Sequence, residues 1–239
     1  MNYFAHAFAF LDDPDADPHF VAGTALSDWL TVADRQVRLR AKHVAPLLED
    51  DPASAALARG TLQHWADDAR FHATRAFVET SLGLSVLARG VLDGEVGMRV
   101  GFLGHLLTEL LLDASLMVED PGRLDRYYEL LAAVDGAWLQ AAVNRVAPRP
   151  TERLAPMFFG FRGRRILWDY LEDGKLLVRL SQVMRRVGLA ELPGDFGAIL
   201  PEARRLVSRR KTELLHGIPA LGPDAAFVCA PSPGRKRPG

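Results

Sequence analysis

The stretch "GFLGHLLTELLLDASLM", residues 101–117, predicts a helix in the protein core. Apart from His105, Glu109 and Asp113 it is almost wholly apolar, and a helix that is hydrophobic all round is a buried helix. A buried carboxylate without a partner costs too much free energy to persist. We therefore expect Glu109 and Asp113 to be compensated by a salt bridge, a hydrogen bond, a helix cap or a metal ion.

Helical periodicity also dominates the rest of the chain, and alternating β-branched runs bounded by turn residues are absent. The periodic segments are residues 52–80, 95–118, 122–146, 164–188 and 198–215. Pro, Gly and Asp interrupt them at residues 11–18, 48–52, 90–95, 119–122, 147–150 and 192–195. The sequence predicts an all-α helical bundle with one domain over residues 1–228. We expect a disordered basic tail over residues 229–239.

The composition limits the cellular compartment and the kinds of functional site that we expect. Of the 239 residues 49% are hydrophobic, enough to bury a sizeable core. No uncharged apolar run reaches the roughly 18 to 20 residues of a membrane span, and the N-terminal stretch has no basic flank typical of a signal peptide. We therefore expect a cytoplasmic protein with no membrane partner. The single cysteine, Cys229, excludes an internal disulfide and a CxxC site, so His, Asp and Glu must hold any metal.

The near-zero net charge hides an uneven distribution. Residues 1–148 hold 12 Lys and Arg against 21 Asp and Glu, whereas residues 149–239 hold 17 against 9. The first part contains every histidine except His216, and the second contains the arginine clusters of residues 161–165 and 204–211. Such a split could bring a cation to one wall of a site and an anion to the other. Alternatively, the two parts complement each other within the fold or across a homodimer.

The stretch "GTLQHWADDARFH", residues 60–72, repeats the four-residue spacing of polar groups. On a helix His64, Asp68 and His72 form one gently winding stripe, and Asp67 falls on the neighbouring face. The solvated face of an ordinary helix has the same pattern. Its repetition in the apolar helix described above favours a metal ion held between the two helices.

His6 and Asp28 also lie in apolar, helix-like surroundings. A lone histidine in such a place is more often a satisfied core residue than a ligand. With the two stripes, however, they complete the ligand inventory of helical metal-dependent phosphohydrolases of the HD type. The candidate ligands for a divalent Mn, Fe or Zn ion are His6, Asp28, His64, Asp68, His105 and Glu109.

Five segments occur in the order of the motifs of a known family. They are "MNYFAH" (1–6), "GTALSDWL" (23–30), "GTLQHWADDARFH" (60–72), "GHLLTELLLD" (104–113) and "LWDYLEDGKLLVRLSQVMRRVG" (167–188). In these segments the chain resembles the acyl carrier protein phosphodiesterase family. The resemblance implies an HD-like helical fold, a divalent metal and hydrolysis of a phosphodiester. It also implies an acidic carrier protein as a partner.

The chain departs from the family pattern at several positions. Trp65 stands where the family has arginine, His72 where it has aspartate, and His105 and Glu109 replace its paired acids. Imidazole and carboxylate can replace each other as metal ligands. Tryptophan cannot replace an arginine that contacts phosphate. The resemblance therefore supports a fold and a metal site more than a substrate.

The candidate residues predict one chemistry. A bound divalent ion would activate a water and polarise a phosphoryl oxygen. We expect His72 or Asp67 to act as general acid or base, and Arg162, Arg164 and Arg165 to bind the phosphoester, although arginines on a solvated face would have the same pattern.

Other reaction classes lack sequence support. The chain has no GxSxG nucleophile motif, no GxxxxGK[ST] phosphate loop and no nucleic-acid-reading motif, so nucleic acid is not an expected partner. Two alternatives stay open. One is a helical metalloenzyme of another reaction class, such as a di-iron oxidase, and the other is a degenerate, non-catalytic relative that binds a partner.

Overall fold

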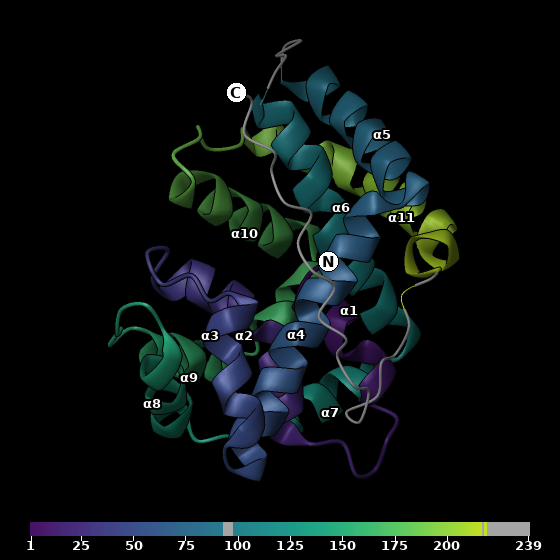
Figure 1. Ribbon diagram of the computed structural model, residues 1–239. Helices are drawn as coiled ribbons and strands as arrows, with labels where there is room; N and C mark the ends of the chain where they lie inside the picture. Colours follow the sequence, from purple (N-terminus) through teal and green to yellow (C-terminus); the bar gives the residue numbers. More distant parts are fainter. Residues whose placement is uncertain (93–97, 217, 219–239) are drawn as a thin grey trace, which may run out of the picture.

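A computed structural model describes residues 1–92, 98–216 and 218 (Figure 1). These residues form helices and no β-strand, which confirms the all-α prediction. The α-helices are α1 Tyr3–Ala7, α2 Pro18–Ala33, α3 Ala41–Val44, α4 Pro52–Ala73, α5 Arg75–Val91, α6 Met98–Glu119, α7 Pro121–Ala132, α8 Gly136–Val146, α9 Leu154–Arg164, α10 Asp173–Arg186 and α11 Leu200–Leu215. Short 3-10 helices cover Phe8–Phe10, Ala45–Glu49, Ile166–Leu171 and Gly194–Ile199. Cys229 and the tail predicted over 229–239 lie outside the described residues.

Helix-capping residues divide two segments that periodicity predicted as single helices. The segment 52–80 breaks at Thr74, whose hydroxyl oxygen accepts a hydrogen bond from the Phe77 amide at 3.1 Å and so begins α5. The segment 122–146 breaks before Asp135, whose carboxylate accepts from the Ala137 amide at 2.8 Å and begins α8.

The segment predicted over 164–188 is also wrong as a single helix. Helix α9 ends at Arg164, and the next residue, Arg165, takes up a left-handed backbone conformation with φ of 46°. A 3-10 turn follows, and α10 begins only at Asp173.

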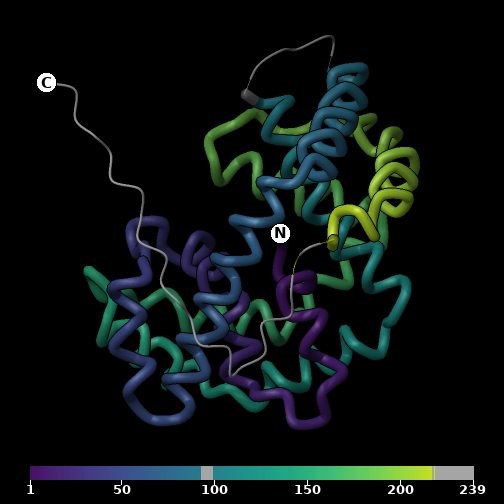
Figure 2. The backbone as a smooth tube through the Cα atoms, turned by 45° about the vertical axis from the view of Figure 1, so that its right-hand side comes forward, coloured from purple at the N-terminus to yellow at the C-terminus, as the bar shows by residue number. Residues whose placement is uncertain are grey.

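The helices form two groups with the chain start between them (Figures 1 and 2). Helices α5, α6, α10 and α11 gather at one end, and α2, α3, α4, α8 and α9 gather at the other. Helix α1 and the N-terminus lie in the middle of both views. The largest fully buried side chains are Trp29, Tyr127, Phe4, Phe71, Phe158 and Phe196. The centre of the molecule is thus where the start of the chain meets helices from both groups.

Two glycines let the backbones of α2 and α4 touch. A Cβ atom at Gly60 would overlap the main-chain oxygen of Phe20, and one at Gly23 would overlap that of Leu57. Only a residue without a side chain fits there. This contact lies one turn from the candidate ligand His64, so it sets the spacing of the two helices close to the site.

Helix α6 is the long apolar helix with which the sequence analysis began. By length and composition alone, its segment Arg99–Glu119 would be able to cross a membrane. Within the protein, 67% of its most apolar window is buried, as in a core helix. Gly104 brings it close to α5, because a Cβ atom there would overlap Ser85 and Ser81.

Ion pairs join the acidic and basic parts of the chain within the fold. Arg210 pairs with Glu79 at 2.9 Å, and Lys211 pairs with Glu119. These contacts support the interpretation that the two parts complement each other inside one molecule.

Candidate metal centre

Side chains from α1, α2, α4 and α6 meet in two groups, each with one potential ligand atom per residue. Within each group these atoms lie within 4.8 Å of one another. The first cluster consists of His6, Asp28 and His64. The second cluster consists of His72, His105 and Glu109. All six residues are candidates from the sequence analysis, and the structure brings them together in two clusters of three.

Both imidazole rings of the first cluster are held through Nδ1. The His64 Nδ1 lies 2.7 Å from the Thr24 carbonyl oxygen, and because a carbonyl only accepts, this nitrogen donates and Nε2 keeps its lone pair. The His6 Nδ1 lies 3.5 Å from Asp67 Oδ2. The two rings are 4.0 Å apart between centroids, and both Nε2 atoms face Asp68, at 3.3 Å and 3.6 Å. Both Nε2 atoms thus point to one place, where the two rings in their neutral form would make a metal ligand pair.

Asp67 occupies a different place from that of a catalytic acid or base. Its side chain is only 2% exposed, and it accepts a hydrogen bond from Gln63 Nε2 at 2.6 Å. Its other oxygen faces the His6 ring. A buried carboxylate behind a metal-binding histidine would fix the orientation of its ring, and Asp67 lies where it could do so for His6.

The first cluster contains buried polar atoms that lack hydrogen-bond partners among the described residues. They are His6 Nε2 and Asp28 Oδ2. Burial raises the pKa of Asp28 to about 7, and burial with the nearby His6 charge lowers the pKa of His64 to about 3. Burial also lowers the pKa of His6, but contacts with Asp67 and Asp68 outweigh it and bring it to about 9. A cation between these atoms would satisfy both orphaned groups at once.

Asp68 and the Met1 amino group link the two clusters. The amino nitrogen lies 2.6 Å from Asp68 Oδ1 and 3.1 Å from Glu109 Oε1. Burial lowers the pKa of the amino group, but the two carboxylates outweigh it and leave the pKa above its ordinary value. Burial likewise raises the pKa of Asp68, and contacts with His6 and the amino group lower it by more. A divalent cation in either cluster would compete with this amino group for the same carboxylates.

The second cluster centres on one carboxylate oxygen. Glu109 Oε1 lies 2.9 Å from His72 Nε2 and 3.1 Å from His105 Nε2. Burial raises the pKa of Glu109, while the Met1 amino group and the two histidines lower it by more. The histidine side chains are 32% and 42% exposed, so this cluster is open to solvent. The structure places His72, which the sequence suggested as an acid or base, in the position of a ligand.

Asp113 serves as a helix cap, one of the alternatives that the sequence left open. Its fully buried carboxylate accepts hydrogen bonds from Asn2 Nδ2 at 2.8 Å and from the amides of Phe4 and Ala5 at 3.1 Å and 2.8 Å. Burial outweighs these bonds and raises its pKa to about 6. These contacts satisfy the free amides at the start of α1, and they fix His6 on that helix relative to α6.

The three arginines expected to bind a phosphoester lie in different surroundings. Arg162 donates hydrogen bonds to main-chain carbonyls at the end of α7, at 3.1–3.3 Å. Arg165 pairs with Asp125 and lies over the ring of Tyr128. These two guanidinium groups therefore hold α9 and its end against α7. Arg164 lines a cavity whose walls include the chain start and α6.

Some groups at the site were not expected from the sequence. The Thr24 carbonyl and the Met1 amino group belong to the backbone, and no residue type signals their position. Gln63 had a usable signal, because it precedes Asp67 by four residues and so lies beside it on α4.

Comparison with protein-family models, with curated proteins and with solved structures gives no match for this chain. The similarity to acyl carrier protein phosphodiesterases therefore stays a prediction. What the protein does is inferred from the geometry of its own residues.

Proposed function

We propose that this protein is a metal-dependent phosphohydrolase that cleaves a phosphodiester, an HD-like enzyme resembling acyl carrier protein phosphodiesterases. The observation that carries the proposal is the first cluster, in which two oriented imidazoles and a carboxylate with an orphaned oxygen converge. Mixed imidazole and carboxylate ligands suit Mn, Fe and Zn ions.

In the proposed site His6, Asp28 and His64 hold one ion, and Asp68 faces it from the side of the second cluster. The second cluster offers places for another ion. Divalent ions bound there would supply an activated water and polarise a phosphoryl oxygen. Thr24 and Asp67 keep the two imidazoles aimed at the first position. The partly exposed His72 and His105 lie on the side from which a substrate would enter.

The first test is the metal content of the purified full-length protein, measured by elemental analysis. We expect Mn, Fe or Zn in near-stoichiometric amount and a clear loss in His64→Ala and Asp68→Ala. The matched control is His216→Ala, because His216 is an exposed histidine that lies outside both clusters. A protein that binds no divalent ion, even after addition of Mn, contradicts the proposal.

The second test is hydrolysis of bis(4-nitrophenyl) phosphate by the metal-loaded protein. We expect turnover that falls at least a hundredfold in His64→Ala and that His216→Ala retains. A metal-loaded protein without activity on this or any other phosphoester would instead favour the partner-binding alternative.

A further inference from the structure

A cavity of about 520 Å³ shares two walls, the chain start and α6, with the candidate metal centre. Asn2 and Tyr3 line it, and they directly follow Met1, whose amino group contacts Asp68 and Glu109. The first residues of the chain thus contact both the cavity and the candidate metal centre. A cavity of this volume is in the usual range for small-molecule sites.

Helix α6 forms a wall shared by the cavity and the second cluster. Leu106 and Leu110 line the cavity, and His105 and Glu109 belong to the cluster. Successive residues on a helix are rotated by about 100°, so the two leucines lie on the face next to the two ligands. A ligand that fills the cavity therefore packs on the face of α6 adjacent to the one that carries His105 and Glu109.

The cavity combines apolar walls with unpaired positive charge. Arg164 at the end of α9 and Arg186 at the end of α10 line it, and within the described parts of the chain neither has an ion pair or a hydrogen bond. A third arginine, Arg179, is already held by Asp169 at 2.8 Å. The remaining walls are mostly apolar, from Val32, Leu106, Leu110, Met157, Phe161 and Val183. Two guanidinium groups without such partners, in a cavity with mostly apolar walls, suit a ligand that joins an anionic group to an apolar segment.

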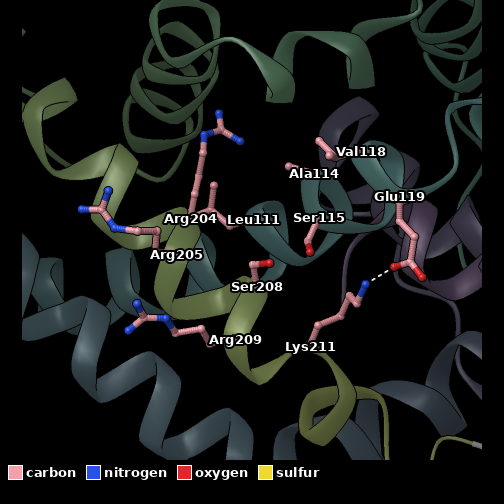
Figure 3. A pocket seen from close by; sticks show the side chains of 10 residues that line it. All are labelled: Leu111, Ala114, Ser115, Val118, Glu119, Arg204, Arg205, Ser208, Arg209 and Lys211. Atoms are coloured by element: carbon pink, nitrogen blue, oxygen red, sulfur yellow. Dashed lines mark hydrogen bonds and ion pairs between the residues drawn. The ribbon is translucent and has the colours of Figure 1, made fainter.

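A second basic hollow, between α6 and α11, has a different character (Figure 3). Its Lys211 is paired with Glu119, as the dashed line in Figure 3 marks. Arg204 and Arg205 form ion pairs with Asp173 and Glu202, two residues that do not line this groove. Its α6 residues, among them Ala114 and Val118, lie on the side of the helix facing away from Glu109. This groove is therefore both more neutralised and turned away from the metal centre.

We propose that the cavity binds a second anionic group of the substrate, joined by an apolar segment to the phosphoester at the metal centre. Arg164 and Arg186 would then select substrates that carry this group, a carboxylate, sulfonate or phosphate. The role in substrate selection rests on the proposed phosphohydrolase function. Binding of an apolar anion to the cavity does not depend on it.

The binding test uses the chelator-treated full-length protein and calorimetric titration with 2-naphthalenesulfonate and with the neutral naphthalene-2-sulfonamide. We expect the sulfonate to bind at least tenfold more tightly. This preference should vanish in Arg164→Gln/Arg186→Gln and return in part in Arg164→Lys/Arg186→Lys. Arg209→Gln is the matched control, an exposed groove arginine that should keep the full preference. Equal affinity for the two probes in the unmodified protein would overturn the proposal.

The substrate test compares two diesters on the Mn-loaded protein, 4-nitrophenyl phenyl phosphate and its 4-carboxyphenyl counterpart. We expect a KM about tenfold lower for the carboxylated diester, and a KM ratio near one in the double glutamine variant. Sulfonate binding without any discrimination between the diesters would overturn the role in substrate selection. Cleavage of neither diester, with selective sulfonate binding intact, would contradict the proposed function and support the anion site.

Discussion

His64 shows how the main chain selects the ligand atom of a side chain. The Thr24 carbonyl accepts a hydrogen bond from Nδ1–H, and the low pKa of about 3 keeps the ring neutral near neutral pH. A neutral ring with a free Nε2 is ready to bind a metal without losing a proton. The neighbouring His6, with a pKa of about 9, would have to release one.

The two clusters should lose metal separately when a histidine is removed from each. We expect His64→Ala to lose the ion of the first cluster and His72→Ala the ion of the second, because the two rings belong to different groups of ligand atoms. Elemental analysis of both variants and of the double variant measures this. If His72→Ala keeps as much metal as the unmodified protein, the second cluster holds no ion.

Asp113 gives a pH-dependent contribution to stability whose sign follows from its burial. Its pKa is raised from 3.8 to about 6 by folding, so the folded state holds the proton more tightly than the unfolded chain. The contribution is therefore fully present below pH 3.8 and is lost as the pH rises through about 6. The stability of the unmodified protein relative to Asp113→Asn should fall by up to about 3 kcal/mol between pH 4 and pH 7.

Urea unfolding of both proteins at a series of pH values checks this prediction. Asp125→Asn serves as the control, because its carboxylate is 53% exposed. A stability difference between the unmodified protein and Asp113→Asn that stays constant over this range would show that the carboxyl titrates alike in the folded and unfolded chain.

The grouping of the residues within the site is the part that the sequence could not supply. Four-residue spacing placed His64, Asp68 and His72 on one stripe, and all three do belong to or contact the two clusters. Over eight residues, however, a helix rotates by about 80° beyond full turns and rises by about 12 Å. His72 therefore reaches the second cluster, whereas His64 belongs to the first. Predicting this division would have required the position of α6 relative to α4.

At the scale of helices, the contact between α2 and α4 should be intolerant of a single added methyl group. In Gly60→Ala the new Cβ would overlap the Phe20 carbonyl, and backbone cannot move aside as a flexible side chain can. We expect a loss of about 2–4 kcal/mol in the free energy of unfolding. The matched control is Gly163→Ala, where a Cβ meets nothing within 4 Å and helix propensity favours alanine by up to about 1 kcal/mol.

Thermal or urea unfolding of the two variants measures the difference. Equal stability of Gly60→Ala and the unmodified protein would show that the two backbones are further apart than the structure places them. Such glycine contacts are hard to predict, because Gly23 and Gly60 look like ordinary helix-weakening residues in the sequence.

The helix type of most segments was predictable, whereas several helix ends were not. Long apolar periodicity in α6 and α11 predicted both helices within a few residues at the ends that the structure describes. The breaks at Thr74 and Asp135 depend on one capping side chain each. A capping residue and an ordinary polar residue on a helix surface are the same in sequence, so periodicity alone joins helices that caps divide.

For the whole molecule, metal binding should raise the stability of the fold. The proposed ligands come from α1, α2, α4 and α6, so an ion in the first cluster would tie the chain start to α2 and α4, and an ion in the second would tie α4 to α6. Metal at a hundred times its dissociation constant adds about 2.7 kcal/mol if only the folded chain binds it. We expect a lower melting temperature after chelation, restored by Mn. His64→Ala/His72→Ala should show no response to either treatment.

The close contact of Gly23 and Gly60 also limits how the sequence of this protein can drift. Any mutation that widens the gap between α2 and α4 would draw the Thr24 carbonyl away from the His64 ring. The carbonyl would then no longer fix which ring nitrogen carries the proton. The two glycines therefore affect both the contact between the helices and the orientation of the His64 ring. Loss of metal binding alone would not free either position, because the backbone contact would still exclude a side chain there.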